Sequence, residues 1–191
     1  MSEFQTYLTL GFEHISDLGA YDHLLFITAL CAVYSWQQWR TLAILVTAFT
    51  LGHSLSLAAS VIAAPLLPAA IVEFLIPLTI LAKCVLNVVQ KSRQQDSRSM
   101  WPHYALVLGF GLIHGMGFSN YLRALLGQEA GILLPLFAFN LGLEIGQLLI
   151  VGIVLAVSWL ALRFLKIIPR AWNLLISGAA AGVSLILLTQ R

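Results

Sequence analysis

The residues best suited to chemistry in this sequence are histidines and carboxylates inside long apolar segments. His23, His53 and His114 stand in three different segments, and Glu73 and Glu144 stand in two more. Imidazole nitrogens suit nickel, cobalt, copper and zinc, whereas carboxylate oxygens suit harder ions as well. If these five side chains converge, they form a site for a divalent transition-metal ion.

Further polar residues lie beside these candidates. Asp22 precedes His23, and because adjacent residues of a helix point about 100° apart, we expect the two to play different parts, with Asp22 either binding the ion or orienting a neighbouring imidazole. Asn140, Glu144 and Gln147 are related by i, i+4 and i+7 and therefore share one helix face.

The same residue types also have structural roles. Asn140 and Gln147 could hold helices together through hydrogen bonds, which contribute about 0.6 kcal/mol each in membrane bundles. Lys83 could form an ion pair with Glu144 or Glu73, or it could act in transport. The sequence leaves these alternatives open.

The composition indicates the solvent in which these groups are buried. Of the 191 residues, 60% are hydrophobic and only 9% are charged, whereas an average soluble domain has about 25% charged residues. The mean hydropathy is +0.91, which indicates an integral membrane protein. The net charge of +2 comes from scattered cations, so we do not expect nucleic-acid binding.

The elements that must position the site are membrane-spanning helices. We predict an all-α polytopic bundle that forms one transmembrane domain over residues 1–191. Residues 1–18 are expected to contain a short interfacial helix. Six segments are long enough to cross about 30 Å of hydrocarbon at about 1.5 Å per residue. They are approximately 19–37, 41–63, 67–90, 103–126, 131–163 and 170–189.

Orientation follows from the cations, since Lys and Arg are retained on the cytoplasmic side. The other side holds only Arg123 and Arg191, together with Glu129 and the acidic amino-terminal segment. We therefore predict that both termini are extracytoplasmic. The cations assigned to the cytoplasmic side are Arg40, Lys91, Arg93, Arg98, Arg163, Lys166 and Arg170.

Five stretches of the sequence resemble the HupE/UreJ family of small bacterial membrane proteins. They contain the signatures DHLLF, FTxxHS, HGxGF and FNxGxExGQ. The stretches are GFEHISDLGAYDHLLF at 11–26, FTLGHSLSL at 49–57, VEFLIPLTILAKCVLN at 72–87, GLIHGMGFSNYL at 111–122 and FNLGLEIGQL at 139–148.

The resemblance implies a multi-pass permease of the bacterial inner membrane for nickel or cobalt. It also implies a role for His14, which by position alone would be a solvated interfacial residue. The recurring polar positions of the family fall here on His14, Asp22, His23, His53, Glu73, His114, Asn140, Glu144 and Gln147.

Three functions are compatible with this sequence. The first is a permease or binding protein for a divalent transition metal, nickel or cobalt above zinc or copper, with the lipid bilayer as surroundings and a second copy or a partner subunit as further partners. The second is an intramembrane zinc hydrolase with a carboxylate as general base and Ser54, beside His53, polarising the substrate. The third is a haem-binding electron carrier. The first is favoured, because no HExxH motif and no histidine pairs suited to stacked haems are found.

Overall fold

The computed structural model describes residues 2–19, 21–63, 67–89, 100–126 and 131–190, except for the side chain of Asn120. These residues form helices and no strand, which confirms the all-α prediction. The helices are α1 (Glu3–Ser16), α2 (Asp22–Cys31), the short 3-10 helix η1 (Trp36–Gln38), α3 (Trp39–Ile62), α4 (Ala69–Val89), α5 (Trp101–Leu126), α6 (Leu133–Phe164) and α7 (Pro169–Gln190).

Four helical stretches are long and apolar enough to cross a membrane: Trp36–Ile62, Ala69–Val89, Leu133–Phe164 and Pro169–Gln190. Together they make this a multi-pass membrane protein. The 32 residues of α6 extend over about 48 Å at about 1.5 Å per residue, so this helix is longer than a perpendicular crossing requires. Six crossings in all stay a prediction.

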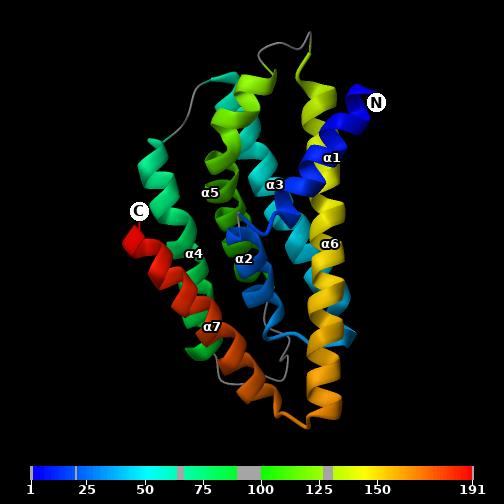
Figure 1. Ribbon diagram of the computed structural model, residues 1–191, viewed down its shortest axis with the longest axis vertical. Coiled ribbons are helices and arrows are strands. Elements are labelled where there is room, and N and C mark those ends of the chain that lie inside the picture. Colours follow the sequence, from blue (N-terminus) through cyan, green and yellow to red (C-terminus); the bar gives the residue numbers. More distant parts are fainter. Residues whose placement is uncertain (1, 20, 64–66, 90–99, 127–130, 191) are drawn as a thin grey trace.

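The helices run back and forth along the long axis of the molecule. The chain descends through α1 and then α2, returns along α3, and continues down α4, up α5, down α6 and up α7 (Figure 1). The most extensive packing is between α3 and α5, between α1 and α6, and between α4 and α7.

The first descending pass is a broken helix. The prediction of one continuous span over residues 19–37 is wrong, because α2 has only 10 residues, about 15 Å of helix. The chain leaves α1 at Ser16, where the Asp17 carboxylate accepts a hydrogen bond of 2.7 Å from the Gly19 amide. This side-chain turn competes with helix continuation. The 14 residues of α1 precede α2 in the same direction, so the two short helices together cover the length that one span would cover.

The amino-terminal helix α1 packs along α6. Its place at a membrane interface stays a prediction. Its start is fixed by a capping box in which Ser2 and Gln5 exchange hydrogen bonds between side chains and backbone amides. Tyr7, Gly11 and Ile15 are buried against the bundle. Because α1 belongs to the packed core, it can position a functional side chain.

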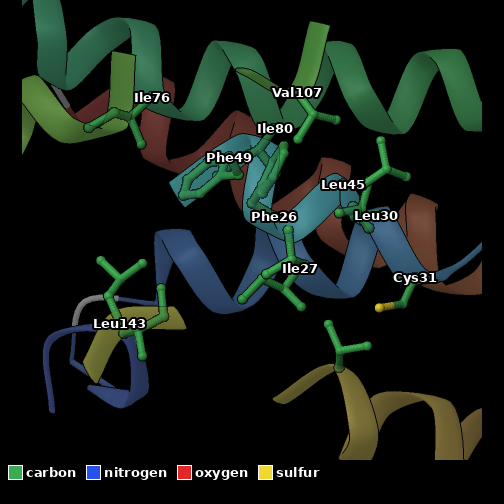
Figure 2. Close-up of a cluster of buried hydrophobic side chains, with 14 of the residues drawn as sticks. Phe26, Ile27, Leu30, Cys31, Leu45, Phe49, Ile76, Ile80, Val107 and Leu143 are labelled. Atoms are coloured by element: carbon green, nitrogen blue, oxygen red, sulfur yellow. The ribbon is translucent and has the colours of Figure 1, made fainter. Parts of the chain in front are cut away.

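The apolar core lies between the two ends of the bundle. Phe26 and Ile27 of α2, Phe49 of α3 and Ile80 of α4 meet there (Figure 2). Phe26 and Phe49 are stacked, with ring centroids 4.9 Å apart. The outward faces of the helices also carry exposed large apolar side chains, as expected for a surface in contact with lipid. Examples are Ile44, Leu51, Leu55, Phe137 and Ile153.

The two ends of the bundle differ in charge. Four cations lie at the helix ends that meet at one end of the molecule, which we call the basic end. They are Arg40 in the first turn of α3, Arg163 near the end of α6, and Lys166 and Arg170 around the start of α7. Pro169 opens α7, at a helix position that favours proline. Lys91, Arg93 and Arg98 of the predicted cytoplasmic loop, with Glu129 and Arg191, lie outside the described residues. Which end faces the cytoplasm stays a prediction.

Candidate metal centre

Four histidines from four helices meet in the interior of the bundle. His14 stands in the last turn of α1 and His23 in the first turn of α2, so the break between these helices brings them to the same level. His53 lies in the middle of α3 and His114 in the middle of α5. The broken helix therefore supplies two imidazoles from one pass of the chain.

The distances within this histidine cluster suit a shared ion. One ligand nitrogen each from His14, His23 and His53 lies within 4.8 Å of the others. The ring centroid of His14 is 4.9 Å from that of His23 and 6.0 Å from that of His53. The ring of His114 is 5.4 Å from that of His23. Because a zinc–nitrogen bond is about 2.0–2.1 Å long, a small inward movement of the rings would allow all three nitrogens to bind one ion.

The imidazoles are buried, yet most of their nitrogens have no hydrogen-bond partner among the described residues. This holds for both nitrogens of His23 and of His53, and for Nε2 of His14. In His114, Nδ1 lies 2.8 Å from the carbonyl oxygen of Phe110, whereas Nε2 has no partner. A backbone acceptor at Nδ1 fixes the tautomer that leaves the Nε2 lone pair available to a metal. Buried polar atoms without partners are rare in folded proteins and need an explanation.

Aromatic rings surround the cluster. The ring of Phe118 is 4.0 Å from that of His14, and Phe139 is 5.7 Å from it. On the other side, the rings of Phe49 and Phe26 lie 5.1 Å and 5.6 Å from His114. These walls lower the local dielectric constant, which strengthens the attraction between an imidazole and a cation. Phe26 and Phe49 also belong to the apolar core, so this core begins directly beside the cluster.

Glycines set the spacing of the helices that carry the histidines. A Cβ atom on Gly115 would lie 2.2 Å from the carbonyl oxygen of His53, and one on Gly111 would lie 2.1 Å from that of Phe49. Between α1 and α6, a Cβ on Gly142 would lie 1.9 Å from the carbonyl oxygen of Leu8. In both pairs the helices therefore approach closely at glycines.

The acidic candidates do not join the three imidazoles that could hold a metal ion together. Glu144 of α6 is half-buried, and its carboxylate accepts a hydrogen bond of 2.6 Å from Thr47 and a second bond from Thr50. The Thr50 hydroxyl oxygen also lies 2.7 Å from Oε1 of Gln147, so its single proton can be given to either acceptor. This acidic cluster of Glu144, Gln147, Thr47 and Thr50 joins α3 to α6.

The remaining candidates occupy separate surroundings. Glu73 is exposed on α4, and Asp22 is half-buried in the first turn of α2. Asn140 donates to the Leu136 carbonyl at 2.8 Å, and its Oδ1 atom is buried without a partner among the described residues. Ser54 donates to the Thr50 carbonyl of its own helix at 2.6 Å.

Lys83 belongs to a second buried polar group, closer to the basic end. Its ammonium donates to Oδ1 of Asn87 at 2.7 Å, so the ion pair considered with Glu144 or Glu73 is not the contact that it makes. Asn87 donates to the Ala29 carbonyl at 2.6 Å and to the Ser177 hydroxyl at 3.1 Å. Asn173 donates to the Asn87 carbonyl at 2.8 Å and accepts from Ser177 at 2.9 Å. This asparagine network ties α2, α4 and α7 together.

Two sets of residues around the site were not predicted from the sequence. Thr47 and Thr50, the partners of Glu144, are polar residues on the helix that carries His53, and their spacing of three residues was a signal that could have identified them. Phe118 and Phe139, which flank His14, are the phenylalanines of the HGxGF and FNxGxExGQ signatures, and their place in these signatures was the signal that could have identified them.

A comparison with families of known proteins gives one match. The model of the family described as "HupE / UreJ protein" matches residues 1–190 of the chain. Searches of curated proteins and of solved structures give no match. The family match covers every helix described above, including the four that carry the histidines.

Proposed function

The chain belongs to the HupE/UreJ family, and on this basis we propose that it is a permease for a divalent transition-metal ion, with nickel or cobalt as the favoured substrate. The observation that supports the proposal most directly is the histidine cluster. Three imidazoles from separate helices, two buried and that of His14 half-buried, place ligand nitrogens within 4.8 Å of one another, and five nitrogens of these rings have no hydrogen-bond partner among the described residues.

The chemistry of the cluster favours this class of ion. Imidazole binds nickel, cobalt, copper and zinc well, whereas magnesium, calcium and manganese prefer oxygen ligands. We assign His14, His23 and His53 as the first ligands and His114, through Nε2, as a fourth. The metal is the transported substrate in this proposal, so the site should bind it reversibly.

In this proposal the carboxylates would attract the ion or bind it briefly on its path through the protein. Asp22 lies next to His23, where its charge would attract a cation to the break between α1 and α2. Glu144 would be available to a passing ion only after its hydrogen bonds to Thr47 and Thr50 open. We propose Glu73, exposed on α4, as a part of the entrance.

We further propose that the protein lies in a bacterial inner membrane with both termini outside. The basic end would face the cytoplasm, as retention of Lys and Arg on that side requires. A divalent cation moving inward would gain about 2.3 kcal/mol per charge per 100 mV from the membrane potential. Broken helices at the substrate site are a recurrent feature of transporters, and the break between α1 and α2 lies at the histidine cluster.

Uptake into proteoliposomes tests the proposal. The purified chain is reconstituted and assayed with nickel, cobalt, zinc, copper, iron and manganese. We expect saturable uptake of nickel or cobalt that is lost in His53→Ala and His114→Ala and retained in His103→Ala, since His103 is exposed and lies outside the cluster. Wild-type uptake by both cluster variants, with all proteins folded, would reject the mechanism.

One observation also favours the zinc hydrolase. Three histidine ligands with an open fourth position form the usual catalytic zinc site. Elemental analysis after purification separates the two functions. A hydrolase retains about one zinc per chain and turns over a lipid or peptide substrate, whereas a permease releases its ion on dialysis and turns over neither.

A further inference from the structure

The side chain of Lys83 presents a charge that no described residue balances. Only 6% of this residue is exposed, and its ammonium makes one hydrogen bond, to the Asn87 amide. Among the described residues it makes no ion pair. An amide oxygen carries no net charge, so the positive charge is buried with a partner that only orients it. Two of its three N–H groups remain for another ligand.

Lys83 lines a cavity of about 160 Å³. One liquid water occupies about 30 Å³, so the cavity has room for an ion with some of its hydration shell. It lies among α2, α3, α4 and α5, on the side of the core away from the histidine cluster. Among the described residues of the wall, His103 and Tyr34 are the others with ionisable or hydroxyl groups, and none is acidic. The remaining wall is largely apolar, with Leu30, Leu86 and Leu106 among its residues.

The asparagine network keeps the ammonium at this wall. Asn87 is fully buried, and its amide nitrogen is already bound to the Ala29 carbonyl and the Ser177 hydroxyl. Its oxygen is therefore held in one place to receive Lys83. Such a rigid arrangement prevents the lysine from extending toward the bundle end, where a long side chain near an interface would usually place its charge.

We propose that this cavity binds a small monovalent anion at the Lys83 ammonium. A buried cation in a medium of low dielectric constant is stabilised by an opposite charge far more than by an amide. One cationic side chain matches one negative charge. The apolar walls offer few groups to replace lost water, so monovalent anions such as bromide or a short carboxylate, which lose much less hydration energy than divalent sulfate, are favoured over it.

The anion would also affect a cation leaving the histidine cluster toward the basic end, because it cancels the positive charge of Lys83 on that side of the core. This consequence rests on the proposed function, whereas anion binding itself does not. Binding is therefore measured on the purified protein without any metal.

Thermal unfolding of the full chain in detergent provides the test. Sodium bromide is titrated against sodium gluconate at constant ionic strength, with sodium acetate and sodium sulfate as parallel series. We expect a saturable rise in the unfolding temperature of the wild type with bromide or acetate and no such rise with sulfate. If acetate alone raises the unfolding temperature, the ligand is a carboxylate. If bromide raises it, the ligand is a simple ion.

Variants locate the effect. Lys83→Met should abolish the saturable response, and Lys166→Met should retain it, because Lys166 is exposed beyond the end of α6. His53→Ala should also retain it, so a failure of metal transport leaves this result intact. An equal response in the Lys83 and Lys166 variants, or no response in the wild type, would overturn the proposal.

A second measurement applies if Lys83→Met does not fold. Crystals of the wild-type chain grown in sodium bromide should show an anomalous scattering peak within hydrogen-bond distance of the Lys83 ammonium. An empty cavity at a bromide concentration above the midpoint of the thermal titration would refute the site.

Discussion

The histidine cluster and the asparagine network are both buried polar groups assembled from several helices, but they differ in how their hydrogen bonds are satisfied. Both nitrogens of His53 lack a partner among the described residues, whereas the side chain of Asn87 donates twice and accepts once. An unsatisfied buried polar atom is costly unless a ligand completes it. The network therefore holds helices together through satisfied hydrogen bonds, whereas the cluster leaves nitrogens open that the proposed ion would bind.

Helix α2 takes part in both regions. His23 in its first turn belongs to the cluster, and the carbonyl oxygen of Ala29 near its end accepts a hydrogen bond from Asn87. A movement of α2 would therefore change both regions. The substitutions that follow separate them, and they are ordered by the size of the effect expected.

The largest effect is expected from His53→Ala, which removes a ligand from the cluster. Structural zinc sites provide about 10–16 kcal/mol over four ligands, so one imidazole contributes roughly 3 kcal/mol and its loss weakens binding about 100-fold. Calorimetric titration of the purified protein with nickel measures the dissociation constant. His103→Ala is the control, and an unchanged constant in His53→Ala would mean that the cluster is not the binding site.

Asn87→Leu should lower the stability of the protein and leave its nickel affinity nearly unchanged. It removes three hydrogen bonds, which at about 0.6 kcal/mol each lower the free energy of unfolding by about 2 kcal/mol. The nickel affinity of the folded fraction should change by no more than about twofold, because distant sites act additively. Denaturant unfolding and the same calorimetry give the two values. A loss of nickel binding at unchanged stability would reverse the roles assigned to the regions.

Gly115→Ala tests whether helix spacing sets the geometry of the cluster. The new Cβ would lie 2.2 Å from both the His53 carbonyl and the Ser56 hydroxyl, so α3 must shift. We expect nickel binding to weaken about tenfold, as for other residues that support metal ligands. The matched control is Gly109→Ala in the same helix, where a Cβ would meet nothing within 4 Å. Equal affinities in the two variants would contradict the spacing argument.

Ser177→Ala should give the smallest effect. Its hydroxyl accepts from Asn87 and donates to Asn173, and losing these bonds should lower the free energy of unfolding by about 1 kcal/mol without changing nickel affinity. Ser184→Ala is the control in the same helix, since its hydroxyl donates only to the Ala180 carbonyl one turn away. If both variants lose the same stability, the network contributes nothing beyond ordinary helix contacts.

Much of the fold followed from the sequence because lipid imposes a simple pattern of long apolar helices separated by polar turns. The break between α1 and α2 did not follow. Residues 19–37 are apolar enough for a span, but the Asp17 turn and the end of α2 at Cys31 divide this part of the chain. Local hydrogen bonding ends the helix here, and a hydropathy profile contains no information about such hydrogen bonds.

Some candidate site residues could likewise be identified from the sequence, whereas the surroundings of others depend on the tertiary structure. His23, His53 and His114 were selected because imidazoles in apolar segments are costly without a role, and the structure brings them together. Glu144 was selected by the same rule and lies instead against two threonines. His14 stands in a segment expected at the interface, and only the packing of α1 along α6 shows that it enters the bundle.

By itself, the sequence determined the solvent, the class of fold, the family and the residue types that can bind an ion, because these depend on composition and spacing along one chain. Only the tertiary structure decided which polar side chains meet and which are satisfied by other partners. Helical spacing places residues on a face of one helix, whereas convergence depends on how closely neighbouring helices approach. Here that approach is set by contacts between glycines of one helix and backbone of the next.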